Sequence, residues 1–194
     1  MKALKYLAVV GGALALVMAG RAEGGKKATL PFVVYGPSQS GMPYIPSGWM
    51  GNHEGVGYAG DCTTGLREGS KQCLKLEYKA ADQWGGIVWQ DPANDWECTK
   101  PGGYDLTGAK KLTLWARGEA GGEKVTFFCG GKKNDSAYSN TAGGESVVEL
   151  TKDWKQYSID LSGKDLSRIK NGFGWSVGGQ GKPVTFYVVD IQYE

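Results

Sequence analysis

The stretch KLTLWARG, Lys111–Gly118, alternates apolar and polar side chains with a period of two residues. In an extended chain, one face then carries the apolar residues Leu112, Leu114 and Ala116. The opposite face carries Thr113, Trp115 and Arg117. This alternation is typical of a β-strand with one buried face.

Similar segments recur along the chain and predict nine more strands: 31–35, 55–59, 74–79, 86–90, 124–129, 146–150, 156–161, 172–177 and 183–193. The 32 glycines and an aromatic share of 11% fit many short strands joined by tight turns. Helical periodicity is nearly absent, with one single turn expected at 165–170. Ten short strands in one domain predict an all-β, antiparallel fold of two packed sheets, a β-sandwich or barrel.

The first 22 residues read as a secretory signal peptide. Lys2 and Lys5 precede an apolar run over 6–20, and small residues follow it. That run is short for a membrane span, so an uncleaved anchor is the weaker alternative. We therefore expect an exported protein, secreted or periplasmic, with a flexible lead-in over 23–30 and a single domain over 31–194.

The net charge argues against a nucleic-acid partner. Removing Lys2, Lys5 and Arg21 with the signal peptide reduces the 22 Lys and Arg to 19, against 20 Asp and Glu. The formal charge thus changes from +2 to −1. A nucleic-acid or acidic-membrane surface would need clustered basic residues instead.

Four cysteines in an exported chain predict two disulfides, and three pairings are open. Cys62 and Cys73 flank the polar segment TTGLREGSKQ, which favours a bond between them, with Cys98–Cys129 as the remainder. The first would close a short loop and stabilise the fold by about 2–3 kcal/mol. Zinc is not expected, because there is no CxxC motif and His53 is the only histidine.

The candidate ligand site lies in WGGIVWQDPANDW, Trp84–Trp96. Trp89 shares a strand face with Ile87, which for Trp89 alone favours the core. Trp84 and Trp96 lie in loops at the two ends of the strand, where packing explains them less well. They are accompanied by polar residues that could bind sugar hydroxyls: Gln90, Asp91, Asn94 and Asp95.

Trp115 and Arg117 are further candidates, since they face away from the leucines of their strand. They would add an aromatic platform and a forked donor if that face lines a cleft. The alternative is that Trp115 faces the core. Three other tryptophans are interpreted as structural: Trp49, Trp154 and Trp175.

Several segments resemble a family of secreted bacterial jelly-roll domains, similar to carbohydrate-binding modules of the galactose-binding-like superfamily. They are YIPSGWMG (44–51), WGGIVWQDPANDW (84–96), GGYDLTGAKKLTLWARGE (102–119), LTKDWKQYSIDLSGKDLS (150–167), GFGWSV (172–177) and TFYVVDIQYE (185–194). The resemblance implies a jelly roll that binds a glycan or polysaccharide without catalysis and requires no cofactor.

The same resemblance implies a structural calcium near the chain ends, with Asp190 as a ligand. Two departures weaken this expectation. Relatives often carry paired acidic residues where this chain has Val189 and Asp190, and an acidic residue where it has Asn52 and His53. A surface aspartate that makes a hydrogen bond is an equal alternative for Asp190.

Two other functions remain open. A small exported β protein could be a matrix or filament subunit that self-assembles through exposed edge strands. An enzyme acting on glycans would need paired carboxylates, for which Asp91, Asp95 and Glu97 are the only cluster. With His53 alone, a serine or cysteine triad is hard to assemble. We rank binding first, assembly second and catalysis third.

Overall fold

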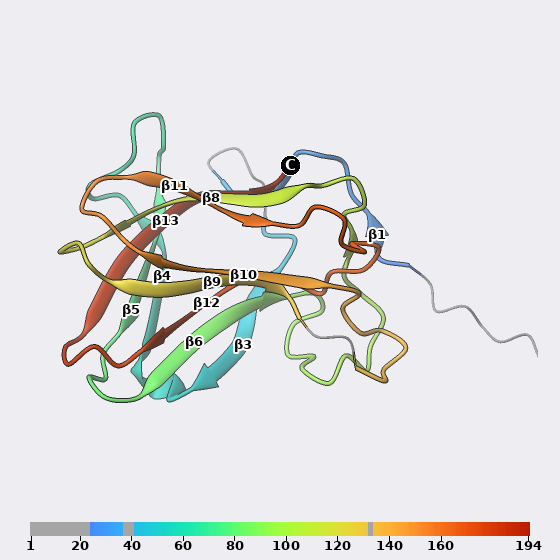
Figure 1. Ribbon diagram of the computed structural model, residues 1–194, viewed down its shortest axis with the longest axis horizontal. Helices are drawn as coiled ribbons and strands as arrows, with labels where there is room; N and C mark the ends of the chain where they lie inside the picture. Colours follow the sequence, from blue (N-terminus) through green and yellow to red (C-terminus); the bar gives the residue numbers. More distant parts are fainter. Residues whose placement is uncertain (1–23, 37–40, 132–133) are drawn as a thin grey trace, which may run out of the picture.

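A computed structural model of the protein describes residues 24–36, 41–131 and 134–194. Two antiparallel sheets pack face to face, as the sequence predicts for a β-sandwich (Figure 1). The predicted signal peptide (1–22) lies outside the described residues. In the described parts of the chain, no helix is both long and apolar enough to cross a membrane.

The first sheet has five strands in the order β10 (Gly143–Glu149), β9 (Lys124–Gly130), β12 (Asn171–Gly178), β6 (Trp84–Gln90) and β3 (Ile45–Gly51). The sequence pattern does not predict β3. It has the weak pattern of an edge strand, because Pro46 cannot donate a ladder hydrogen bond and Gly48 has no side chain.

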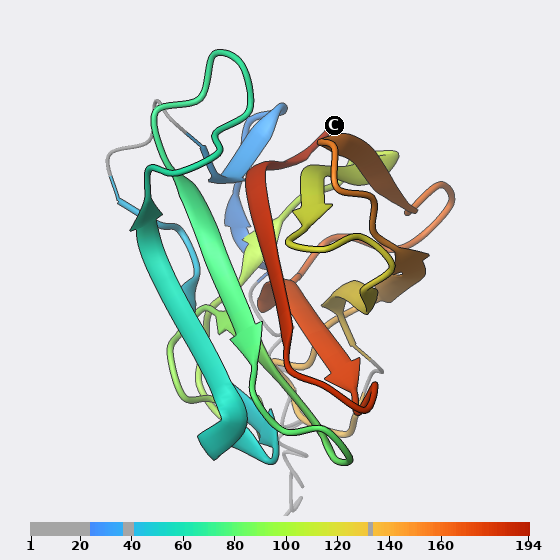
Figure 2. The same ribbon diagram turned by 90° about the vertical axis from the view of Figure 1, so that its left-hand side faces the viewer.

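The second sheet has the order β11 (Lys155–Asp160), β8 (Lys111–Gly118), β13 (Val184–Tyr193), β5 (Cys73–Tyr78) and β4 (Val56–Cys62), with β2 (Phe32–Tyr35) also paired to β13. Figure 2 shows β4, β5 and β13 side by side, with the loop between β4 and β5 rising from one end. A 3₁₀ turn, η1 (His53–Gly55), joins β3 to β4.

The apolar faces of both sheets form one core. The leucines of β8 and β5 face inward, as their alternation predicts. In β13 the alternation breaks at Asp190, whose φ is 53°, and the register shifts between Val189 and Gln192. Val188 and Ile191 both enter the core as a result. Strict alternation along 183–193 predicts that Val188 and Ile191 lie on opposite faces, and this bulge shifts the phase so that they do not.

Two local predictions also need correction. The segment 165–170 contains no helical turn, and Ile169 forms an isolated bridge with Tyr104. Within the predicted flexible lead-in, β1 (Lys26–Lys27) pairs in parallel with β7 (Tyr104–Asp105). This part of the chain is thus tied to the sandwich by main-chain hydrogen bonds.

Candidate functional site

The outward side of the five-stranded sheet, here called the open face, carries three rows of residues that cross the strands in register. The first row is Glu145, Phe128, Gly174, Val88 and Gly48. The second row is Val147, Thr126, Ser176, Gly86 and Met50. The third row is Glu149, Lys124, Gly178 and Trp84. Most residues between these on each strand point into the core instead, but Trp49 on the edge strand β3 stays exposed.

Aromatic rings lie on glycines of the open face or beside it. A Cβ built on Gly48 would lie 2.7 Å from Cζ2 of Trp96, and one on Gly51 would lie 2.9 Å from Cδ2 of Trp84. The ring of Phe128 covers Gly174 in the same way. Trp84 and Trp96 remain 53% and 46% exposed. The glycines thus let flat rings rest on the sheet while much of each indole stays accessible to a ligand.

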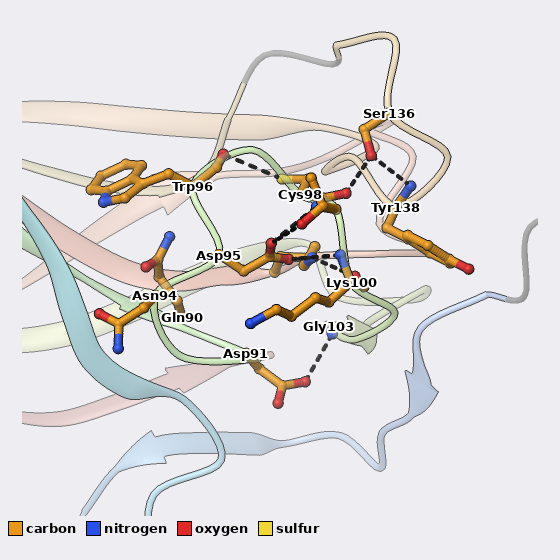
Figure 3. A network of polar contacts seen from close by, with 12 residues as sticks. Gln90, Asp91, Asn94, Asp95, Trp96, Cys98, Lys100, Gly103, Ser136 and Tyr138 are labelled. Carbon is orange, nitrogen blue, oxygen red and sulfur yellow. Dashed lines mark hydrogen bonds and ion pairs between the residues drawn. The ribbon is translucent and has the colours of Figure 1, made fainter.

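Trp96 is positioned by the loop 91–103, which a buried ion pair holds to the sandwich. Asp95 accepts an ion-pair hydrogen bond from Lys170 Nζ, and both residues are almost fully buried. Asp95 also accepts hydrogen bonds from Thr99 N at 3.0 Å and Lys100 N at 3.3 Å. Figure 3 shows this network, with the Trp96 indole pointing away from it.

Lys170 also ties a neighbouring loop, 134–141, to the site. Lys170 Nζ donates to Lys100 O at 2.7 Å, and Lys170 N donates to Asn140 Oδ1 at 2.7 Å. Ser136 Oγ donates to Cys98 O. Lys170 therefore holds the loop 91–103 through its ammonium group and the loop 134–141 through its main-chain N–H, at one end of the sandwich (Figure 1).

The acidic cluster considered for catalysis is built into this scaffold. Burial alone would raise the pKa of Asp95, but hydrogen bonds from Lys170, Thr99 and Lys100 outweigh it and lower the pKa. Asp91 accepts hydrogen bonds from Lys26 Nζ at 2.9 Å and from Gly103 N at 2.8 Å. An ionised, buried Asp95 is unsuited to donate a proton at neutral pH.

Two predicted ligand residues of the stretch Trp84–Trp96 lie inside the protein. Trp89 has no exposed surface and packs against Phe173 and Tyr58. Gln90 is 1% exposed and its amide hydrogen-bonds Asn171 and Ser47 at 3.3 Å each. Neither can touch an external ligand, so their assignment to the binding site is corrected. Of the remaining residues in this stretch, Trp84, Asn94 and Trp96 are exposed, while Asp91 is half-buried.

Trp115 and Arg117 lie on the other sheet, on its outward side, here called the covered face. The leucines of β8 face the core, so the alternative that Trp115 faces the core is wrong. The loop between β4 and β5 covers this face. Arg67 of that loop stacks on Trp115 at 4.1 Å, and Arg117 stacks on Tyr187 at 4.0 Å. These two predicted residues are therefore separated from Trp84 and Trp96 by the whole sandwich.

The four cysteines are free thiols in the structure, so the two predicted disulfides are absent from it. Cys62 and Cys73 are cross-strand partners in β4 and β5. Cys98 Sγ instead donates to Trp96 O, whereas Cys129 belongs to the core. Burial raises the pKa of Cys73 to about 12 and that of Cys129 to about 11. Both stay protonated at neutral pH, so neither is a thiolate nucleophile.

The residues around Asp190 do not fit a calcium site. Its carboxylate pairs with Arg67 at 2.8 Å, and a guanidinium in that place opposes a divalent cation. Among the described residues, no group of three or more Asp, Glu, His or Cys side chains could hold a metal ion. The hydrogen-bonding alternative for Asp190 is the one that the geometry fits.

Three other tryptophans were interpreted as structural. Trp175 is fully buried in the core, which confirms that interpretation. Trp154 is half-buried, and its Nε1 donates to Gly65 O at 3.1 Å. Trp49 differs from the prediction, since it is 43% exposed on the edge strand β3.

Phe128, Met50 and Ser176 belong to the open face but were not predicted. The strands of Phe128 and Ser176 were predicted, but the sequence does not show which of their faces is outward, and β3, which carries Met50, was missed. The available signal was the glycine spacing itself, at Gly48, Gly86 and Gly174, which marks places where rings approach the main chain.

No family model matches this chain, and no curated protein matches its sequence. Solved structures match its fold. A family 30 carbohydrate-binding module of the Clostridium thermocellum cellulosomal cellulase Cel9D-Cel44B matches with a TM-score of 0.59 and 18% identity, over 84% of this chain and 96% of that one. A family 11 module from Clostridium thermocellum, in complex with a β-1,3-1,4-mixed-linked tetrasaccharide, matches with a TM-score of 0.55 and 14% identity, over 84% and 94%.

The chain therefore has the β-sandwich, jelly-roll fold of carbohydrate-binding modules, as the resemblance in its sequence predicts. At these identities the likeness concerns the fold.

Proposed function

We propose that this protein is an exported, non-catalytic carbohydrate-binding module, and that the open face is its binding surface. The observation that carries the proposal is the pair of exposed indoles, Trp84 and Trp96, resting on glycines of one sheet face. The carbohydrate-binding modules that share this fold support it.

The chemistry of the open face suits a sugar chain. One side of a pyranose ring presents C–H groups, which pack on an indole, and its edge presents hydroxyls. The polar side chains of the open face include Thr126, Ser176 and Glu145, which can donate to or accept from hydroxyls. A mostly apolar surface with a few polar groups is typical of ligand sites.

The distances suit an oligosaccharide. Val88, beside Gly48 and Trp96, lies four residues along β6 from Trp84, or about 13 Å at the rise of a strand. Phe128 and Gly48 are three strand spacings apart, or about 14 Å. A ligand that contacts two of these rings must therefore span more than one sugar ring.

The test is a titration of the protein with soluble glycans, followed by tryptophan fluorescence. We expect a saturable change for at least one glycan and an affinity at least tenfold lower in Trp96→Ala, as for a central aromatic contact. Trp175→Phe, which removes a tryptophan from the core, is the control. It should lower the fluorescence while the glycan affinity stays unchanged. A flat response to every glycan would contradict the proposal.

Self-assembly is the second candidate, because exposed apolar side chains lie on both edge strands of the five-stranded sheet. Val147 on β10 is 73% exposed, and Ile45 and Trp49 on β3 are 45% and 43% exposed. Such edges can pair with a second copy. Sedimentation that depends on protein concentration, without sugar, would favour this function.

A further inference from the structure

A hollow of about 710 Å³ opens where the first row of the open face reaches the edge strand β10. Phe128 and Glu145 belong to the first row and also line the hollow, so the hollow continues the open face. Four glycines provide most of the remaining wall: Gly130, Gly131, Gly143 and Gly144. Its volume lies within the range of about 300–1,000 Å³ that is usual for small-molecule sites.

Close packing against the main chain and against Ile159 explains why much of this wall has no side chains. A Cβ on Gly143 would lie 2.5 Å from Gly131 N, and one on Gly144 would lie 2.7 Å from Cγ2 of Ile159. Gly130 has a φ of 63°, which side chains disfavour. The hollow is thus a fixed feature of the β9–β10 pair.

The two charged side chains that line the hollow have complementary hydrogen-bonding roles. Lys164 Nζ donates to Gly143 O at 2.6 Å. An ammonium group has three N–H donors, so two remain for a ligand. The exposed Glu145 carboxylate supplies acceptors. Together they can bind neighbouring hydroxyls of one sugar ring.

The position of Lys164 also limits how far a bound glycan chain can extend along the first row. Its contact with Gly143 attaches the loop between β11 and β12 to the edge of the sheet. A chain that crosses the open face from Trp96 past Phe128 would meet this loop one strand further on.

We propose that the hollow is a terminal subsite, which holds the last sugar of a neutral glycan chain through Glu145 and Lys164. This inference rests on the proposed function, since it assumes that the open face binds glycan. It adds that the protein recognises chain ends or short chains better than the interior of a polymer.

The experiment is isothermal titration with three oligosaccharides, each compared with a polymer of the same linkage: the mixed-linked β-1,3-1,4 tetrasaccharide, cellohexaose and mannohexaose. Glu145→Ala and Lys164→Ala are the test variants. Glu68→Ala is the matched control, because Glu68 is also an exposed glutamate but lies in the loop between β4 and β5, over the covered face. Lys182→Ala is the control for an exposed lysine elsewhere.

We expect each test variant to lower affinity for the bound oligosaccharide about tenfold, since each removes a charged hydrogen-bonding group. Affinity for the polymer should change less than twofold, and the controls should change neither. Equal losses for oligosaccharide and polymer, or no loss for either, would overturn the terminal subsite. If the unchanged protein binds none of these sugars, the proposed function fails too. If Trp96→Ala abolishes binding while both test variants bind normally, only the terminal subsite is wrong.

Discussion

The open face and the covered face both display tryptophan, yet they differ in what lies over the rings. On the open face, Trp84 and Trp96 rest on glycines and stay about half exposed. On the covered face, Arg67 stacks on Trp115, and Gly65 O accepts hydrogen bonds from Arg117 and Trp154. The rings of the covered face stack with a loop of the same chain, whereas about half of each indole on the open face stays accessible.

The difference shows that residue type alone does not define a sugar site. Trp115 and Arg117 on one strand predict an aromatic platform and a hydrogen-bond donor for a ligand. In the structure, both instead contact the loop between β4 and β5 of the same chain. What distinguishes the open face is its supports: glycines beneath the rings and a buried ion pair beneath the loop of Trp96. Variants on the two faces should therefore differ in their free energy of unfolding and in their glycan affinity.

The largest effect is expected from Lys170→Met. It would leave the Asp95 carboxylate buried without its cation, which typically costs about 3–5 kcal/mol. We expect that loss in the free energy of unfolding, measured in urea, together with weaker glycan binding because the loop of Trp96 loses its anchor.

Two controls test whether the unpaired charge of Asp95 causes the lower stability of Lys170→Met. Lys26→Ala removes an exposed ion pair with Asp91 and should cost less than about 1 kcal/mol. The double variant Lys170→Met/Asp95→Leu should recover stability, because no unpaired charge remains. Equal stability of Lys170→Met and the unchanged protein would show that the pair is not a support of the open face.

The ion pair between Lys170 and Asp95 also predicts that the free energy of unfolding depends on pH. The folded-state pKa of Asp95 is lowered, so its stabilising contribution is fully present above the unfolded pKa of about 3.9. It is lost as the pH falls through the lower, folded-state pKa. In urea unfolding at several pH values, the stability gap between the unchanged protein and Asp95→Asn should narrow as the pH falls below 4. A gap independent of pH would contradict an ionised Asp95.

Trp115→Ala tests the covered face. It removes a half-buried indole and its stacking with Arg67, which we expect to lower the free energy of unfolding by about 2 kcal/mol. Glycan affinity should stay unchanged, the reverse of the expectation for Trp96→Ala. Lost binding with unchanged stability would move the site to the covered face.

The sequence predicts the sandwich well, because burial on one side forces a period of two into β5 and β8. It misses β3, where Pro46 and Gly48 erase the pattern, and the bulge at Asp190, which one backbone angle creates. The site is harder still. The strand pattern already favours the core for Trp89, but only the folding of the loop 91–103 shows that Trp96 lies over Gly48.

The smallest effect is expected from Gly174→Ala. This variant keeps the Phe128 ring but changes its position. The new Cβ would overlap the Phe128 ring, which is half-buried and can swing outward, so stability should fall by no more than about 1 kcal/mol. Glycan affinity should fall severalfold, because Phe128 leaves the first row.

Gly178→Ala is the matched control: it lies on the same strand and face, and a Cβ there meets nothing within 4 Å. It should leave stability unchanged, and its affinity shows the effect of a methyl group on the open face when Phe128 keeps its position. Gly86→Ala gives the contrasting case, because its Cβ would meet the main chain at Trp175 and Ser176, which cannot move aside cheaply. If Gly174→Ala binds glycan as well as Gly178→Ala does, Phe128 is no part of the binding surface, and the open face reduces to its two tryptophans.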